Sequence, residues 1–157
     1  MKELDLLTKI IVCSYKELSS EEKNLTDAAR RASQNAYAPY SRFRVGAAVL
    51  LADGRIVPGS NQENASYPVG LCAERTALFA AGAQYPDVPV KAIALAAESE
   101  TGTPAAPVTP CGACRQVLCE VEARYGSPVR VLMCGADEVW TAASARDLLP
   151  LSFSLSE

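Results

Sequence analysis

Three cysteines and one glutamate have the types and spacing of a metal site that can activate water. Cys111 and Cys114 are three residues apart, so at the start of a helix their side chains share one face, and Cys72 can add a third thiolate. Three protein ligands leave one position of a tetrahedral zinc open, which a catalytic zinc requires. Glu74 follows Cys72 by two residues and can reach a water held at that position. The spacing therefore predicts one catalytic zinc ion per chain.

The absence of histidine narrows the chemistry. The chain contains no histidine, which excludes Ser-His-Asp triads, Cys-His dyads and histidine-ligated zinc. A Cys-x-x-Cys pair alone also fits a redox motif or a structural zinc knuckle, but a structural site normally closes with a fourth Cys or His. Arg75 can donate to the ligand sulfurs and offset the net negative charge of three thiolates on Zn²⁺. The other thiols, Cys13, Cys119 and Cys134, lie in apolar contexts and are expected in the core.

Composition predicts one globular domain. The 157 residues are 49% apolar and 21% charged, as in ordinary globular chains. A net charge of −3 gives no attraction to the phosphates of nucleic acid, so we expect a small, uncharged or weakly charged ligand. The segment after Met1 lacks the apolar run of a signal peptide, and no stretch has the length of a transmembrane helix. We therefore expect a cytoplasmic protein with reduced thiols and with no membrane or nucleic-acid partner.

Helical and strand-like patterns alternate along the chain and predict a layered α/β domain. A capping box formed by Ser19 and Glu22 begins a helix that we expect to end near Asn35. The expected strands are 44–51, 55–60, 90–97, 129–133 and 138–141. The further helices are expected at 72–82, where Gly82 would end the helix, at 111–125 and at 143–149. Residues 1–18 are expected to be an N-terminal extension, in which the run 9–13 could form an extra edge strand.

Five motifs carry a resemblance to a known family. They are APYSRF at 38–43, VGAA at 45–48, NQEN at 61–64, CAERTALF at 72–79 and TPCGACRQ at 109–116. The Cys-x-Glu and Pro-Cys-x-x-Cys elements within them match the signature of zinc-dependent nucleobase deaminases. In this order and combination, the motifs resemble cytidine deaminases of the small, single-domain, homotetrameric kind, and the resemblance runs from Glu22 to Phe153.

The resemblance implies a fold and an activity. The fold would be a three-layer α/β/α sandwich with a mixed five-stranded sheet, formed by residues 19–157 as a single catalytic domain. The activity would be zinc-dependent hydrolytic deamination of cytidine and deoxycytidine to uridine and deoxyuridine plus ammonia, in pyrimidine salvage. Two alternatives stay open: a related aminopyrimidine deaminase such as blasticidin-S deaminase, and a non-catalytic zinc-binding module.

The resemblance also implies roles for individual residues. Cys72, Cys111 and Cys114 would bind zinc, and Glu74 would move protons between the attacking water, the ring nitrogen N3 and the leaving amine. Considered alone, Glu74 could equally be an exposed helix carboxylate.

The remaining roles concern the nucleoside. Asn61 and Glu63 would bind the ribose hydroxyls, although in isolation the same residues are typical of a polar turn. Phe153 would close over the base, and its alternative is a frayed end. The other implied substrate contacts are Phe43 against the base, the N–H of Ala73, the carbonyl of Thr109, and Ala65 and Tyr67, which would reach a neighbouring subunit's site.

Overall fold

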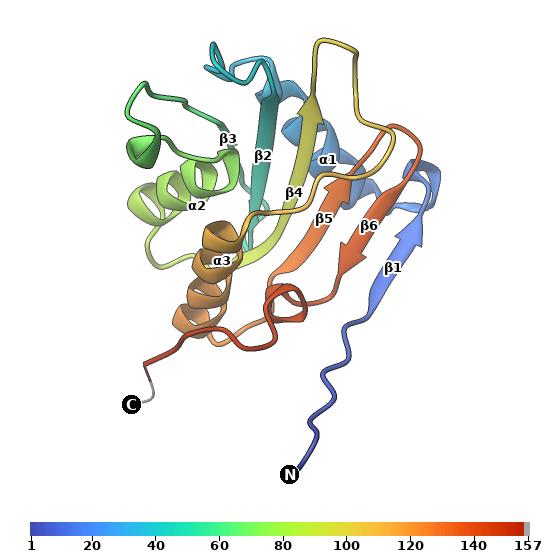
Figure 1. Cartoon of the computed structure of the whole chain (residues 1–157), viewed down its shortest axis with the longest axis vertical. Helices are drawn as coiled ribbons and strands as arrows, with labels where there is room; N and C mark the ends of the chain where they lie inside the picture. Colours follow the sequence, from blue (N-terminus) through green and yellow to red (C-terminus); the bar gives the residue numbers. More distant parts are fainter. Residues whose placement is uncertain (156–157) are drawn as a thin grey trace.

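A mixed sheet of six strands organises the chain (Figure 1), and the computed structural model describes residues 1–155. The strand order is β1-β6-β5-β4-β2-β3. The strands are β1 (Ile10–Cys13), β2 (Arg44–Leu51), β3 (Ile56–Ser60), β4 (Val90–Glu98), β5 (Arg130–Cys134) and β6 (Val139–Ala142). Strands β4 and β5 run parallel, joined by the crossover helix α3 (Gly112–Tyr125), whereas the other neighbours pair antiparallel.

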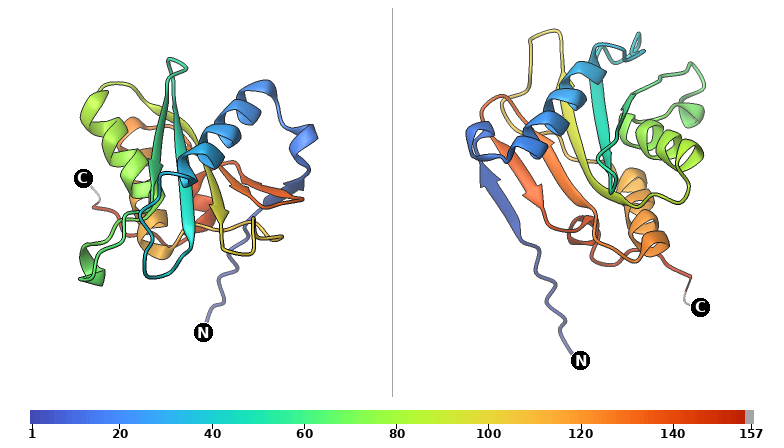
Figure 2. Two further views of the ribbon diagram at one scale, coloured as in Figure 1. Left: turned by 90° about the horizontal axis from the view of Figure 1, so that it is seen from above. Right: turned by 180° about the vertical axis from the view of Figure 1, so that it is seen from behind.

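Helices cover both faces of the sheet (Figure 2). Helix α1 (Ser20–Ser33) lies on one face, and α2 (Ala73–Gln84) and α3 lie on the other. Side chains alternate along β2 accordingly: Ala47 and Val49 belong to the core cluster beneath α2 and α3, whereas Ala48 and Leu50 belong to the cluster beneath α1. This arrangement confirms the predicted three-layer α/β/α sandwich.

The predicted number of five strands is wrong, because the sheet has a sixth strand at its edge. Strand β1 pairs antiparallel with β6, with Ile10 opposite Ala142 and Cys13 opposite Val139. The strand-like run at 9–13 therefore joins the sheet through a partner far away in the sequence. The division at residue 18 into an extension and a catalytic domain stays a prediction.

Two helix ends show how local sequence sets the boundaries. Helix α2 continues through Gly82 to Gln84, so the predicted stop at Gly82 is wrong; a glycine inside a helix costs only about 1 kcal/mol relative to alanine. Tyr85 leaves the helical region because Pro86 follows it. Helix α3 ends as expected at Gly126, whose φ of +61° suits glycine at this position. Within residues 1–155, no helix combines the length and the apolar character needed to cross a membrane.

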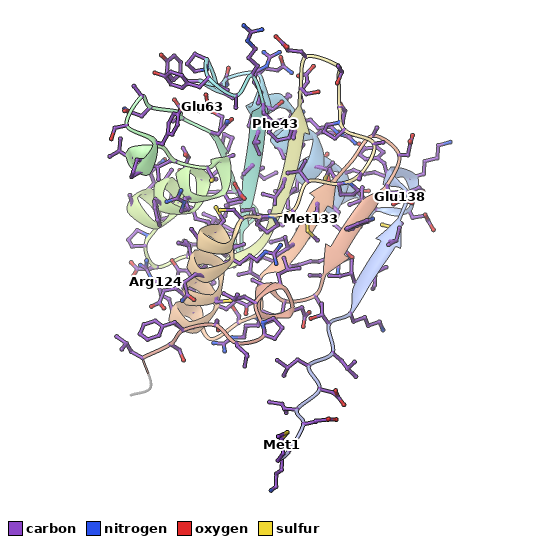
Figure 3. All side chains as sticks on the ribbon, in the orientation of Figure 1. Met1, Phe43, Glu63, Arg124, Met133 and Glu138 are labelled. Carbon is purple, nitrogen blue, oxygen red and sulfur yellow. The ribbon has the colours of Figure 1, made fainter. Side chains whose placement is uncertain are left out.

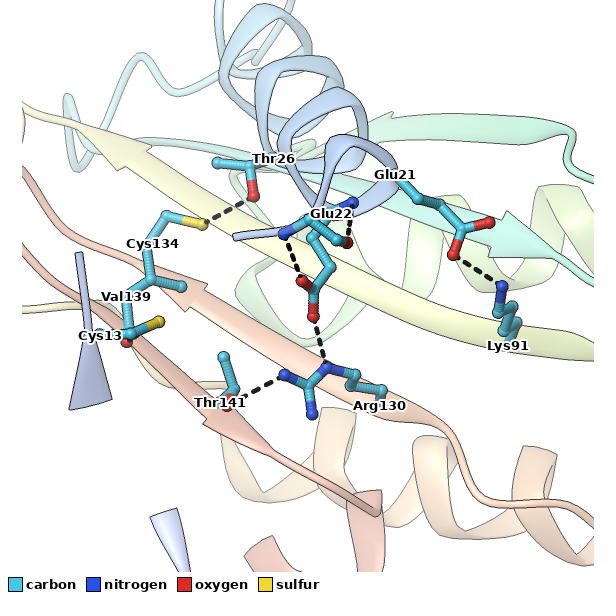
Figure 4. Close-up of polar contacts among 10 residues, drawn as sticks. Cys13, Glu21, Glu22, Thr26, Lys91, Arg130, Cys134, Val139 and Thr141 are labelled. Atoms are coloured by element: carbon cyan, nitrogen blue, oxygen red, sulfur yellow. Dashed lines mark hydrogen bonds and ion pairs between the residues drawn. The ribbon is translucent and has the colours of Figure 1, made fainter. Parts of the chain in front are cut away.

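Ion pairs join α1 to the sheet (Figure 4). Arg130 on β5 donates from Nε to Glu22 at 2.7 Å, and Lys91 on β4 donates to Glu21 at 2.6 Å. The same Glu22 accepts from the backbone N–H of Ser19, which confirms the predicted capping box. The Glu22 carboxylate thus caps the N-terminus of α1 and also pairs this helix with β5.

A close approach of α2 to β3 positions the first turn of α2. A Cβ atom added at Gly59 would lie 2.4 Å from Ala77 N and 2.8 Å from Ala73 O, so only glycine lets the helix backbone come this near. Ala73 and Ala77 are themselves fully buried. The start of α2, with Cys72 directly before it, is therefore held rigidly against the sheet.

Candidate active site

Two helix N-termini bring the three predicted metal ligands together. Cys72 and Cys111 are the N-cap residues of α2 and α3, and Cys114 lies in the first turn of α3. The Sγ atoms of Cys72 and Cys111 are 3.8 Å apart, and those of Cys111 and Cys114 are 3.5 Å apart. All three ligand atoms lie within 4.8 Å of one another. A tetrahedral zinc with Zn–S bonds of about 2.3 Å requires sulfurs about 3.8 Å apart, so these thiols fit the ion.

The electrostatic surroundings favour a thiolate at Cys72. Helix N-termini carry partial positive charge, and Arg75 Nη2 donates to Cys72 Sγ at 3.7 Å. A hydrogen bond with Cys114, assisted by Arg75, lowers the pKa of the Cys72 thiol against the opposing effect of burial. The same hydrogen bond raises the pKa of Cys114, so Cys72 holds the thiolate of this pair. Arg75 Nε is buried and has no hydrogen-bond partner among residues 1–155.

Glu74 is buried directly beside the thiols. Glu74 lies in the first turn of α2 and is only 5% exposed. An ordinary surface carboxylate would be far more exposed. Burial raises the pKa of Glu74; its own backbone N–H opposes this shift, and the charge of Cys72 adds to it. The carboxyl group therefore lies where a proton can be held next to the metal ligands.

A cavity of about 470 Å³ opens beside Cys72. It is lined by Tyr40, Ser41, Asn61, Gln62, Glu63, Asn64, Tyr67, Gly70, Leu71, Cys72 and Arg75. The fold thus brings four predicted site residues, Asn61, Glu63, Tyr67 and Arg75, to the same cavity as a predicted zinc ligand. Its volume is in the range of small-molecule sites, about 300–1,000 Å³.

The segment 40–45 holds Asn61 and Glu63 in place. Asn61 Oδ1 accepts from Val45 N at 2.8 Å. Glu63 accepts from Tyr40 N at 2.9 Å, from Ser41 N at 3.2 Å and from the Ser41 hydroxyl. The Ser41 hydrogen bond is the main cause that lowers the pKa of Glu63, so this carboxylate is ionised at neutral pH. Both side chains are therefore preorganised on one wall of the cavity.

The other predicted substrate residues lie outside the cavity lining. Phe43 is half-buried just before β2, and Figure 3 labels it at the same end of the sheet as Glu63. Ala73 is fully buried at the start of α2. Ala65 is exposed before the short 3-10 helix η2 (Tyr67–Val69), and Thr109 is exposed in the loop before α3. Phe153 is 71% exposed and is not among the residues that line the cavity in its own chain.

Sequence reasoning missed two polar residues that follow Cys114. Arg115 donates from Nε to Pro110 O at 2.7 Å, from Nη2 to Thr109 Oγ1 at 3.4 Å and from Nη1 to Leu148 O at 3.0 Å. Gln116 bonds to the backbone of Phe153. Their presence in the motif at 109–116 was a signal, but two of their partners, Leu148 and Phe153, lie in a segment that only the fold brings near.

Comparison with known proteins identifies relatives of the chain. The family model "Cytidine and deoxycytidylate deaminase zinc-binding region" matches residues 19–125, which include all three cysteines of the site. A cytidine deaminase of Halalkalibacterium halodurans is 48% identical over 101 residues, covering 64% of this chain and 72% of that protein. A cytidine deaminase of Mycobacterium tuberculosis is 41% identical over 135 residues, covering 82% of this chain and 86% of that protein.

Solved structures agree with these sequence matches. The crystal structure of cytidine deaminase from Burkholderia pseudomallei is 44% identical, with a TM-score of 0.70, and the match covers 83% of this chain and 98% of that one. The crystal structure of cytidine deaminase from Mycobacterium tuberculosis gives a TM-score of 0.65 at 35% identity, covering 87% of this chain and all of that one. The fold of the chain and the fold of these enzymes are therefore alike over nearly the whole length of the relatives.

Proposed function

The chain belongs to the cytidine and deoxycytidylate deaminase zinc-binding family, and we propose that it converts cytidine and deoxycytidine to uridine and deoxyuridine with release of ammonia. The observation that carries the proposal is the meeting of three thiols at zinc-binding distances with a buried Glu74. A metal-binding module without activity would not need a buried carboxylate beside a three-ligand site. Zinc held by Cys72, Cys111 and Cys114 is the cofactor of this chemistry.

Glu74 carries the proton transfers of the proposed mechanism. When bound, zinc supplies the Lewis acidity that makes a water nucleophilic near neutral pH. The Glu74 carboxylate takes a proton from the attacking water as the new bond forms between oxygen and C4 of the pyrimidine, and delivers a proton to N3. Glu74 then takes the remaining proton of the new C4 hydroxyl and passes it to the 4-amino group, the bond between C4 and nitrogen breaks as the C4 carbonyl forms, and ammonia leaves. Because the chain has no histidine, one carboxylate serves every step.

The cavity wall supplies the proposed nucleoside contacts. Asn61 and Glu63 bind the ribose hydroxyls, and their fixed hydrogen bonds to the 40–45 segment support this role. Phe43 packs against the base, while the Ala73 N–H and the Thr109 carbonyl contact the base edge. The short distance in sequence from Ala73 to Cys72 and from Thr109 to Cys111 supports these backbone contacts.

The assembly is proposed to be a homotetramer with composite active sites. Tyr67 is 76% exposed and Phe153 is 71% exposed, although both are large and apolar. Their exposure, with that of Ala65, supports contacts across a subunit boundary. Phe153 would then close over a base in a neighbouring site. The net charge of −3 supports a small nucleoside, and not nucleic acid, as the ligand, and the role in pyrimidine salvage and a cytoplasmic location belong to the same proposal.

A direct assay tests the function. Purified, zinc-loaded protein should decrease the absorbance of cytidine and of deoxycytidine as they become uridine and deoxyuridine. Blasticidin S is the competing substrate, and the pair Asn61 and Glu63 at the cavity favours a nucleoside. Faster turnover of blasticidin S than of cytidine would show that cytidine is not the preferred substrate. If no aminopyrimidine is turned over, the protein is a zinc-binding module without deaminase activity.

A further inference from the structure

Two neighbouring residues on α3 hold the segment 149–153. Arg115 Nη1 donates to Leu148 O at 3.0 Å, at the end of the 3-10 helix η3 (Ala145–Leu148), just before this segment. Gln116 Nε2 donates to Phe153 O at 2.8 Å, and Gln116 Oε1 accepts from Phe153 N at 3.1 Å, at the far end of the segment. The segment is thus held at both ends by the turn of α3 that follows the zinc ligand Cys114.

The pair of bonds to Phe153 fixes its backbone direction. One side-chain amide satisfies both the N–H and the carbonyl of the same residue, as a neighbouring strand would. Phe153 is 71% exposed as a residue, so burial within its own chain does little to hold the side chain in place. The position of the ring therefore depends on the hydrogen bonds of Gln116.

Arg115 also connects the segment 149–153 to the chain next to the candidate metal site. Besides Leu148 O, its guanidinium reaches Pro110 O at 2.7 Å, and Pro110 directly precedes Cys111. A planar guanidinium with several donors can span these acceptors, which a lysine could not do. The segment 149–153 and the loop that carries Cys111 are consequently tied to one rigid point on α3.

We propose that Gln116 is a positioning residue, which sets the place of Phe153 so that its ring can close over the base of the nucleoside. This inference rests on the proposed function. In it, Gln116 contributes to substrate binding although it touches neither the substrate nor the metal. It requires that Gln116 act through Phe153, so the two residues must be coupled in substrate binding.

A double-mutant cycle tests the coupling. Gln116→Leu removes both hydrogen bonds at similar volume, and we expect KM for cytidine to rise about fivefold with kcat within twofold, as for loss of two partly exposed neutral hydrogen bonds. Gln116→Glu keeps the acceptor for Phe153 N but sets a carboxylate oxygen against Phe153 O, so it should also raise KM. In a Phe153→Ala background, Gln116→Leu should add nothing to KM.

The control is Glu120→Leu, an equally polar-to-apolar change one turn further along α3, at an exposed residue. It should leave KM unchanged. Additive effects of Gln116→Leu and Phe153→Ala, or an unchanged KM in Gln116→Leu, would overturn the inference. If Gln116→Leu fails to fold or loses zinc, Gln116→Glu takes its place in the cycle and the same criteria apply.

Amide hydrogen exchange at Phe153 measures the hydrogen bonds without substrate. Exchange should be faster in Gln116→Leu than in the wild type, and unchanged in Glu120→Leu. Equal exchange in all three proteins would overturn the inference, even where deamination is normal. Absence of deaminase activity in the zinc-loaded wild type would instead refute the proposed function, with the exchange data still deciding whether Gln116 holds Phe153.

Discussion

The side chain of Asn61 pairs with Val45 in place of a strand neighbour. Val45 N donates to Asn61 Oδ1 at 2.8 Å, and Asn61 N donates to Val45 O at 3.1 Å. Asn61 Nδ2 donates to Phe43 O at 2.9 Å, so both ends of the amide are used. The amide thereby prolongs the pairing of β2 with β3 beyond Ser60 and has one orientation at the cavity wall.

Asn61→Asp should therefore weaken both the fold and the site. Aspartate has no donor for Phe43 O, and it places a negative charge against that carbonyl. We expect the free energy of unfolding to fall by about 1–3 kcal/mol, measured by urea denaturation, and KM for cytidine to rise. Asn64→Asp is the matched control, because the oxygen that accepts from Ser66 N at 2.8 Å is kept. Equal stability of the two variants would contradict the role of the Asn61 amide.

Glu63→Gln tests the ribose contact. The variant keeps the shape of the side chain and removes its charge, while zinc should stay bound. Losing a charge-assisted hydrogen bond to a ribose hydroxyl should lower kcat/KM by roughly 10- to 150-fold. Steady-state kinetics with cytidine measures the loss. An unchanged kcat/KM would mean that Asn61 and Glu63 only form a polar turn and do not bind the ribose.

Ser41→Ala separates substrate contact from loop geometry in this test. It removes the hydroxyl that donates to Glu63 but leaves the carboxylate in the cavity. We expect a smaller loss of kcat/KM than in Glu63→Gln. An equal loss in the two variants would mean that Glu63 acts by holding the 40–41 segment.

The metal site predicts a simple pattern of zinc content. Cys111→Ala should lose both zinc and activity, because two remaining thiolates cannot hold a catalytic ion tightly. Cys13→Ala should lose neither, since Cys13 on β1 packs against the core cluster beneath α1, on the other face of the sheet from α2 and α3, and donates only to Val139 O, at 3.6 Å. Elemental analysis of the dialysed proteins measures zinc per chain. Stoichiometric zinc in Cys111→Ala would contradict the ligand assignment.

The three thiols of the candidate zinc site could be predicted from the sequence because the spacing within each motif is local. The spacing of Cys111 and Cys114 places both at one helix start, and the motif around Cys72 does the same for α2. The order of helices and strands was also predictable from periodicity. The extra strand β1 was harder, because a short apolar run becomes a strand only where it finds a partner, here β6.

The hydrogen bonds that support the site could not be read from sequence. Nothing local shows that Glu63 bonds to Ser41, or that Gln116 bonds to Phe153. Such contacts join segments far apart in the chain, so they depend on the tertiary fold. At Gly82 a local signal was misleading. Glycine often ends helices, but Gly82 lies within α2, where packing on the sheet outweighs its low helix propensity.

Glu22 should make stability depend on pH. Burial acts to raise its pKa, but hydrogen bonds from Ser19 and the ion pair with Arg130 outweigh it and lower the pKa. A carboxyl with a lowered folded pKa stabilises the fold above its unfolded value of about 4.3, and this contribution is lost as pH falls through the folded pKa. Glu22→Gln, which can keep the capping box, should cost about 0.5–1 kcal/mol at pH 7.

Urea denaturation at several pH values measures this dependence. The difference in free energy of unfolding between wild type and Glu22→Gln should be full at pH 7 and should shrink in acid. Glu21→Gln is the control, because the Glu21–Lys91 pair is half-exposed on both sides and should contribute less. A difference that stays constant down to acid pH would exclude the ion pair as its source.

The mechanism depends most on Glu74. Glu74→Gln keeps the volume of a side chain that is only 5% exposed, so the fold should survive. Zinc content should also survive, because the three thiols that meet at the site belong to Cys72, Cys111 and Cys114. The amide cannot accept a proton from water or deliver one to N3 and the leaving amine. With no histidine in the chain to take over, the loss should be felt in every transfer.

The measurement is kcat for cytidine in Glu74→Gln that has been shown by metal analysis to carry zinc. Loss of general acid–base catalysis typically lowers rates by about 10²–10⁴-fold, and we expect the upper end because one group serves several steps. KM should change little, since the cavity wall at Asn61 and Glu63 is untouched. A fall in kcat of less than about tenfold, below the range for such a catalyst, would mean that another group moves the protons.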